Sequence, residues 1–149
     1  MSKKSAKIAE LLESCRGHPG LNAHYAGYFE CFNRGLYFEA HDVLEELWLT
    51  DKQSPNHSFY KGLIQFAGAF VHLQKNRLRP SAALFKLARA NMQKYPNVHE
   101  ELDIKCLIEL IADWLGWLES SEFTVNPLSH HPPPQLTLRS SHLPPPRSK

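Results

Sequence analysis

A chain of 149 residues with 42% hydrophobic and 21% charged residues has the composition of one ordinary globular domain with a core of its own. The formal net charge of +2 is too small to indicate a nucleic-acid or membrane-surface partner. Cys15, Cys31 and Cys106 are odd in number and widely spaced, which argues against a disulfide framework or a zinc knuckle and favours a reducing cytoplasm.

Residues 1–21 predict a short helix followed by a linker. Glu10 and Glu13 interrupt the apolar run of this segment, which the hydrophobic region of a secretory signal would not tolerate. The most apolar stretch of the chain, residues 62–73, is far shorter than the roughly 20 residues that span a bilayer. No transmembrane segment is therefore expected.

Residues 22–120 predict a compact helical bundle, so the expected fold class is all-α, with about five to six helices in the chain. Asn22 is a suitable N-cap for the first bundle helix, and Gly35 suits the left-handed residue that closes many helices. The later helices are predicted over 36–50, 58–76, 81–95 and 100–119, with Pro80 at the start of the third of these. No stretch alternates polar and apolar residues, so no sheet is expected.

Residues 124–149 form a proline-rich, basic tail without acidic residues. This composition cannot bury enough apolar surface to fold alone, so the tail is expected to be flexible and extended, with polyproline II character. Two alternatives stay open. Leu136, Leu138 and Leu143 would let the tail dock as an arm on a neighbouring subunit, or its prolines would serve as a ligand for an adaptor domain.

The predicted helix 36–50 contains the densest group of side chains that could ligate a metal ion or transfer a proton. His41 lies within its apolar stripe, and Glu45 follows one turn later, so both side chains can point toward the same neighbour. An imidazole and a carboxylate at this spacing can ligate a divalent ion or act as an oriented acid–base pair. Gln65 and His72 interrupt the otherwise apolar helix 58–76, and an antiparallel pairing of the two helices would bring His72 near His41.

Two hypotheses follow for His41, Glu45, Gln65 and His72. In the first they form a polar site between helices that binds a divalent metal ion or a small ligand, with His41, Glu45 and His72 as candidate metal ligands. A hydrolytic enzyme would follow if the ion kept an open position and a water. In the second they form a closed hydrogen-bond network, and the protein is a non-enzymatic, dimeric interaction module.

Other residues receive structural interpretations. Glu39, Asp42 and Glu46 are expected on a solvated face, and Trp48, Trp114 and Trp117 are expected to anchor a core or an interface. The stripe of the last helix, with two tryptophans, exceeds what one small core readily hides, so a homodimer is expected. The sequence has no GxGxxG, Walker loop, HExxH or nucleophile elbow that would name a reaction.

Two long stretches resemble a known family, the domain of unknown function 309. They are FNRGLYFEAHDVLEELW at residues 32–48 and FYKGLIQFAGAFVHLQKN at residues 59–76, followed by an alanine-rich helix over 82–95. The resemblance covers about residues 25–117 and implies an all-helical bundle without an established activity. The positions that match family motif residues are Glu39, His41, Glu45, Trp48, Gln65 and His72, and Gly62 lies in the second stretch as a small residue for close helix packing.

This chain departs from the family pattern at two places. Asp42 stands where the family has glutamate, which shortens the side chain by about one methylene and weakens any ligand role for this carboxylate. The proline-rich tail is not part of the pattern either.

Overall fold

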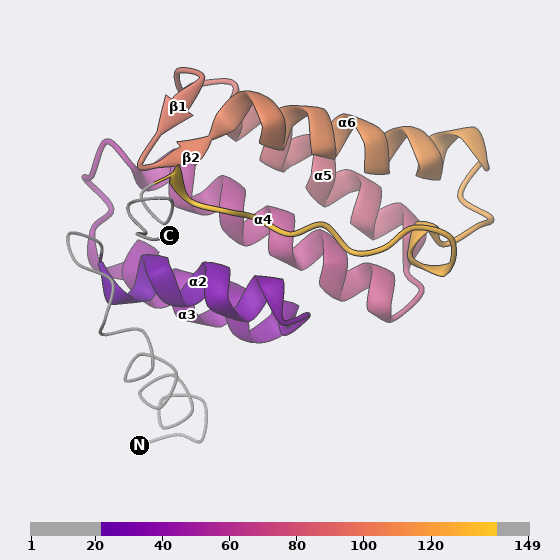
Figure 1. Cartoon of the computed structure of the whole chain (residues 1–149), viewed down its shortest axis with the longest axis horizontal. Coiled ribbons are helices and arrows are strands. Elements are labelled where there is room, and N and C mark those ends of the chain that lie inside the picture. The colour runs from indigo at the N-terminus through magenta and orange to yellow at the C-terminus, as the bar shows by residue number, and fades with distance from the viewer. Residues whose placement is uncertain (1–21, 140–149) are drawn as a thin grey trace, which may run out of the picture.

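The computed structural model describes residues 22–139, and over this range the protein is a bundle of five α-helices with one small hairpin (Figure 1). The elements are α2 (Ala23–Asn33), α3 (Tyr37–Thr50), α4 (His57–Gln74), α5 (Leu78–Met92), β1 (Val98–His99), β2 (Leu102–Asp103), α6 (Ile104–Ser120) and a 3-10 turn η1 (Pro127–Ser129). The expected all-α class is confirmed. The short helix predicted within residues 1–21 and the tail residue Leu143 lie outside the described residues.

The ends of α2 form as the sequence predicts. The side chain of Asn22 accepts a hydrogen bond from the backbone N–H of His24, and Gly35 has a φ of 79°. The N–H groups of Gly35 and Leu36 bond to the carbonyls of Phe32 and Cys31 respectively, which is the Schellman arrangement. This tight ending lets α3 begin at once and turn back against α2.

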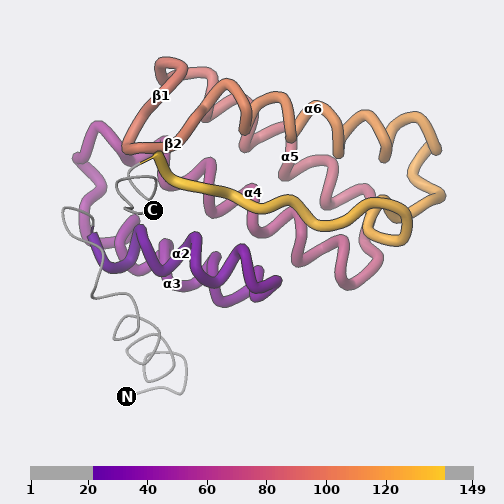
Figure 2. Tube along the Cα trace, in the orientation of Figure 1, coloured from indigo at the N-terminus to yellow at the C-terminus, as the bar shows by residue number. Residues whose placement is uncertain are grey.

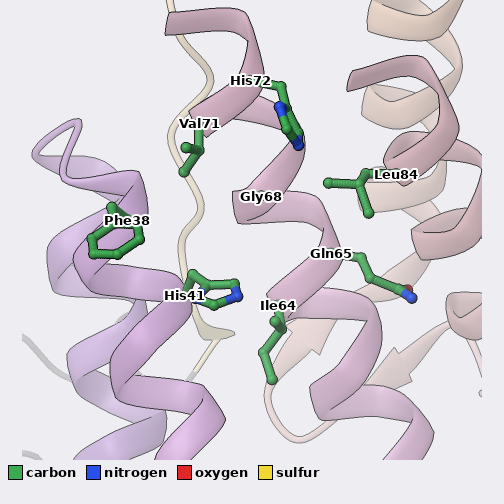
Figure 3. A pocket seen from close by; sticks show the side chains of 8 residues that line it. All are labelled: Phe38, His41, Ile64, Gln65, Gly68, Val71, His72 and Leu84. Carbon is green, nitrogen blue, oxygen red and sulfur yellow. The ribbon is translucent and has the colours of Figure 1, made fainter. Parts of the chain in front are cut away.

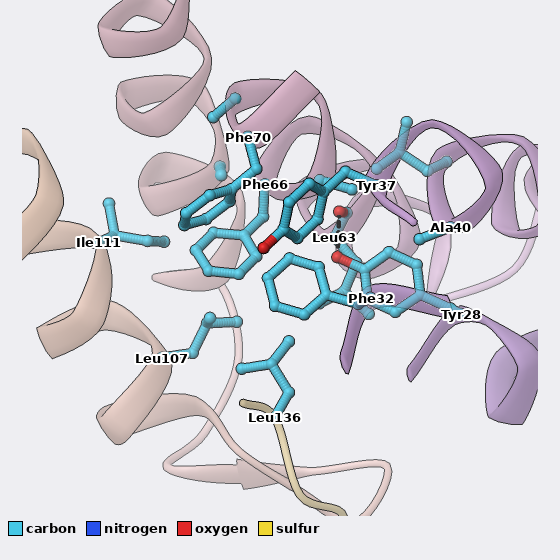
Figure 4. Packing of buried hydrophobic residues seen from close by; sticks show 14 of the residues in the cluster. Tyr28, Phe32, Tyr37, Ala40, Leu63, Phe66, Phe70, Leu107, Ile111 and Leu136 are labelled. Carbon is cyan, nitrogen blue, oxygen red and sulfur yellow. Dashed lines mark hydrogen bonds between the residues drawn. The ribbon is translucent and has the colours of Figure 1, made fainter. Parts of the chain in front are cut away.

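Each helix packs on the next one in the chain: α2 on α3, α3 on α4, α4 on α5, and α5 on α6. The central α4 supplies the middle of an aromatic core in which Phe66 and Phe70 contact the ring of Phe32 at centroid distances of 5.3 and 5.5 Å (Figure 4). The hydroxyl of the fully buried Tyr28 donates to the carbonyl of Leu63 over 2.6 Å. Edge-to-face and stacked rings thus join α2 to α4.

The hairpin corrects the expectation of no sheet. Val98 pairs with Asp103 and His99 with Leu102 in an antiparallel register, and the two turn residues, Glu100 and Glu101, both have a positive φ, 48° and 62°. Two left-handed residues form the turn that matches the twist of a hairpin, and asparagine and glycine usually fill it. Because the sequence has two glutamates there, its helix prediction starts at residue 100, whereas α6 begins at Ile104.

The described part of the tail is extended, as expected, and it is also packed on the bundle. Residues 124–139, here named the strap, turn back from α6 and run along the bundle to the hairpin (Figures 1 and 2). Leu136 and Leu138 are only 5% and 6% exposed and belong to the core. The ring of His131 stacks on Trp117 of α6 at 3.5 Å. The composition predicts that the tail cannot fold alone, but it can pack on surface supplied by the bundle.

Within residues 22–139, no helix combines the length and the apolar character that crossing a membrane requires.

Candidate functional site

A pocket of about 240 Å³ opens between α3, α4 and α5 on the outer face of α4. Its lining is mostly apolar and comprises Phe38, Ile64, Gly68, Val71 and Leu84, together with His41, Gln65 and His72. Figure 3 shows His41 reaching from α3 toward α4, while Gln65 and His72 project from α4 on either side of Gly68. An apolar concavity with a few polar groups is the usual form of a small-ligand site.

Antiparallel packing of α3 on α4 brings His41 and His72 to the same pocket, although the two residues are 31 positions apart in the chain. His41 comes from the first turns of α3 and His72 from the last turns of α4. Gly68 lies between the two α4 residues and has no side chain to fill the space. A methyl group there would come to 3.1 Å from Cδ1 of Leu84, so the glycine keeps the floor of the pocket open.

A second group of side chains begins at His41 and continues along α3. His41, Asp42 and Glu45 each offer a nitrogen or oxygen atom, and these three atoms lie within 4.8 Å of one another. Nδ1 of His41 is 3.0 Å from Oδ1 of Asp42, whose side chain is 7% exposed. Among the described residues, this is the one group of three histidine, cysteine or acidic side chains that is close enough to share a metal ion.

The burial of Asp42 corrects the prediction that it lies on a solvated face with Glu39 and Glu46. Asp42 is 6% exposed, whereas Glu39 is half-buried and Glu46 lies 2.9 Å from Nε2 of His24 on α2. A buried carboxylate needs polar partners, and the ring of His41 is one of them. Helical periodicity alone could not find this pair, because adjacent residues do not share a helix face.

The surroundings of His72 favour the neutral form of its imidazole. Burial, and then the nearby cations Arg77 and Lys75, lower the pKa of its imidazole from the ordinary value of 6.5. Its buried Nδ1 has no hydrogen-bond partner within the part of the chain that the structure describes. Polar atoms in this condition are uncommon, so His72 retains unused bonding capacity beside the pocket.

Gln65 is already engaged. Its Oε1 accepts a hydrogen bond of 2.8 Å from the side chain of Asn91 on α5, and Asn91 in turn accepts from Nζ of Lys94 over 3.1 Å. Asn91 is 9% exposed. These contacts tie α4 to α5, which is the structural role that the network hypothesis gives to Gln65.

The four predicted site residues therefore separate into two groups that share His41. His41, Gln65 and His72 line the pocket, while Glu45 joins His41 and Asp42 on α3 and is not among the residues that line the pocket. Of the three predicted metal ligands, the structure brings His41 and Glu45 together but not His72. The third side chain of their cluster is Asp42.

The remaining predicted structural residues lie around this site. Trp48 is half-buried, stacks on His57 at 4.8 Å, and has Nζ of Lys61 at 5.9 Å from its ring. Gly62 faces α5, where an added methyl group would collide with the end of the Met92 side chain.

The exposed Cys106 is no candidate nucleophile, since a hydrogen bond with Asp103 raises the pKa of its thiol.

In a comparison with protein families, residues 25–84 match the family described as Domain of unknown function (DUF309). Residues 25–84 are similar to this family and are called the DUF309-like region below. The resemblance seen in the sequence is thereby confirmed for this range. No curated protein and no solved structure matches the chain.

The DUF309-like region contains most of α2, all of α3 and α4 and the first half of α5, and its last matched residue, Leu84, also lines the pocket. The whole pocket and the cluster on α3 therefore lie inside the family region. Helix α6 and the strap lie after it.

Proposed function

We propose that the DUF309-like region of this chain binds a divalent metal ion through His41, Asp42 and Glu45, next to a pocket that takes a small ligand. The observation that supports this most directly is the grouping of the three ligand atoms within 4.8 Å on one helix. One imidazole and two carboxylates form a ligand set that suits zinc or manganese. Because bonds to such ions are about 2.0–2.2 Å long, small side-chain rotations would bring all three atoms to one ion.

The pocket supports a role for the ion in chemistry. His41 belongs to both groups, so a ligand in the pocket would lie beside the ion. A divalent ion with three protein ligands keeps a position for water and lowers the pKa of that water. Hydrolysis of a small, partly apolar ligand is the reaction class that this arrangement suits.

A second candidate function is a non-enzymatic interaction module in which the polar groups only fix the register of the helices. The chain of hydrogen bonds from Gln65 through Asn91 to Lys94 favours it. The unused Nδ1 of His72 favours the first proposal, because a closed network would leave no such atom.

Calorimetric titration of tag-free, chelator-treated protein with zinc and with manganese tests the metal site. We expect one ion per chain, and we expect His41→Ala and Glu45→Gln each to weaken binding by at least about tenfold. Glu46→Gln is the matched control, because it removes the same charge from the same helix outside the cluster.

Melting temperatures measured with and without added metal distinguish the two functions. Because His41 contacts Asp42 in the metal-free fold, His41→Ala should lower the melting temperature of the metal-free protein under either function. Under the metal proposal, zinc or manganese raises the melting temperature of wild type and not that of His41→Ala, whereas under the network function the ion raises neither. Equal metal affinity for wild type and both cluster variants would disprove the metal site.

A further inference from the structure

One side of the bundle is closed by the strap and not by a helix. The strap contacts α2 through Asn33 and α6 through Trp117, and it passes between these two helices over α4 (Figure 1). Leu136 enters the core beside Phe32 and Leu107 (Figure 4). Without the strap, the apolar groove between α2 and α6 would face solvent.

The groove recognises the strap in the way that proteins recognise extended peptides. The side chain of Asn33 accepts a hydrogen bond from the N–H of Leu136 and donates one to its carbonyl, both over 2.7 Å. The backbone N–H of Arg139 bonds to the carbonyl of Glu101 in the hairpin. Main-chain bonds with two leucines placed two residues apart are the features of bound extended segments.

The segment that joins α6 to the strap is under backbone strain. Glu122 and Phe123 follow each other with φ angles of 54° and 61°, and neither is a glycine. The left-handed conformation brings Cβ too close to the backbone, so two such residues in succession carry a steric cost. The chain accepts this conformation where it must reverse direction to lay the strap on its own groove.

We propose that the groove between α2 and α6 also takes the strap of a second copy of this chain, giving a dimer that exchanges straps. The occupant follows from the contacts above, since a partner's strap has the same sequence and finds the same leucine sites and the same Asn33. Exchange lets residues 121–126 extend and relieves the left-handed pair, and strained hinges favour such exchange. Docking within one chain is favoured by effective concentration, so the dimer forms at high protein concentration.

Shortening the hinge tests the proposal. Deletion of Glu122 and Phe123 should prevent the strap from reaching the groove of its own chain. It removes the contact of Phe123 with Arg79 but none of the strap's contacts with Asn33, Trp117 and Glu101. Light scattering should give twice the monomer mass for this variant. The same deletion combined with Asn33→Ala should return it to a monomer, because the partner's strap then loses both bonds to the Asn33 side chain.

The full chain provides two independent readouts. Wild type refolded at high protein concentration should show a dimer fraction that refolding at low concentration lacks, and Glu122→Gly with Phe123→Gly should lower that fraction by removing the strain. A wild type that stays monomeric at every concentration would overturn the proposal. So would a dimer that persists in a chain ending at residue 123, since its interface must lie elsewhere.

Discussion

His41 connects the pocket with the cluster of Asp42 and Glu45. Its ring is nearly parallel to that of Phe38, with centroids 6.2 Å apart and an angle of 12°, and its Nδ1 is close to the carboxylate of Asp42. A carboxylate beside one ring nitrogen orients an imidazole. The ring of His41 is thus oriented by contacts within α3.

His72 makes stability depend on pH. The folded state disfavours its charged form, so the unfolded chain binds the proton more tightly. Its contribution to stability is complete above pH 6.5, the ordinary pKa, and is lost as the pH falls below that value. Chelator-treated wild type should therefore lose more melting temperature between pH 7.5 and 5.5 than His72→Gln does. Equal losses would contradict the prediction.

Substitution by alanine should have opposite effects on stability at two helical glycines, Gly62 and Gly116. A methyl group at Gly62 would strike the Met92 side chain and lie 3.1 Å from Cβ of Asn91, whereas nothing lies within 4 Å of a methyl group at Gly116. We expect Gly62→Ala to destabilise the fold by about 1–3 kcal/mol through overpacking of α4 on α5. Gly116→Ala in α6 should stabilise it by about 0.5–1 kcal/mol.

Urea denaturation of both glycine variants measures these effects. Their opposite signs serve as the control, because helix propensity alone would stabilise both variants. A Gly62→Ala protein as stable as wild type would mean that α5 can move away from α4 at no cost.

Helical periodicity predicts most of the elements but not their ends. The start of α3 is predicted to within one residue, because Gly35 marks the turn that precedes this helix. The helix predicted over 81–95 is α5, Leu78–Met92, so both predicted ends lie three residues too late in the chain. Tyr95 is drawn out of the helix by tertiary contacts: its hydroxyl donates to the carbonyl of Pro55 and accepts from the N–H of Phe59.

Contacts distant in sequence account for what periodicity does not predict. The sequence places His41, Gln65 and His72 at one helix interface, and the structure brings them to one pocket. It does not reveal that Asp42 is buried or that Leu84 closes the far side, because both depend on three-dimensional neighbours. The same holds for Leu136, whose burial depends on a groove formed more than a hundred residues earlier.

At the scale of the whole molecule, two kinds of contact hold the fold together. The helices pack in chain order, so most contacts between them join neighbouring elements. The strap is the exception, because Asn33 and Leu136 are separated by 103 positions. Closing a loop of that length has an entropic cost that local helix pairs do not pay.

The strap should therefore dock after the folding transition state. Contacts that form late affect the unfolding rate and leave the folding rate nearly unchanged. We expect Leu136→Ala to reduce stability by about 2–5 kcal/mol, almost entirely through faster unfolding in stopped-flow experiments. Slower folding of this variant would show that the strap belongs to the folding nucleus.

Late docking of the strap also defines an interval during folding. A chain that has assembled its five described helices still exposes the side of the core around Phe32 and Leu107 until Leu136 arrives. Folding intermediates with exposed apolar surface associate at high protein concentration. The lifetime of this intermediate, more than the stability of the finished fold, then sets how often one copy captures the strap of another.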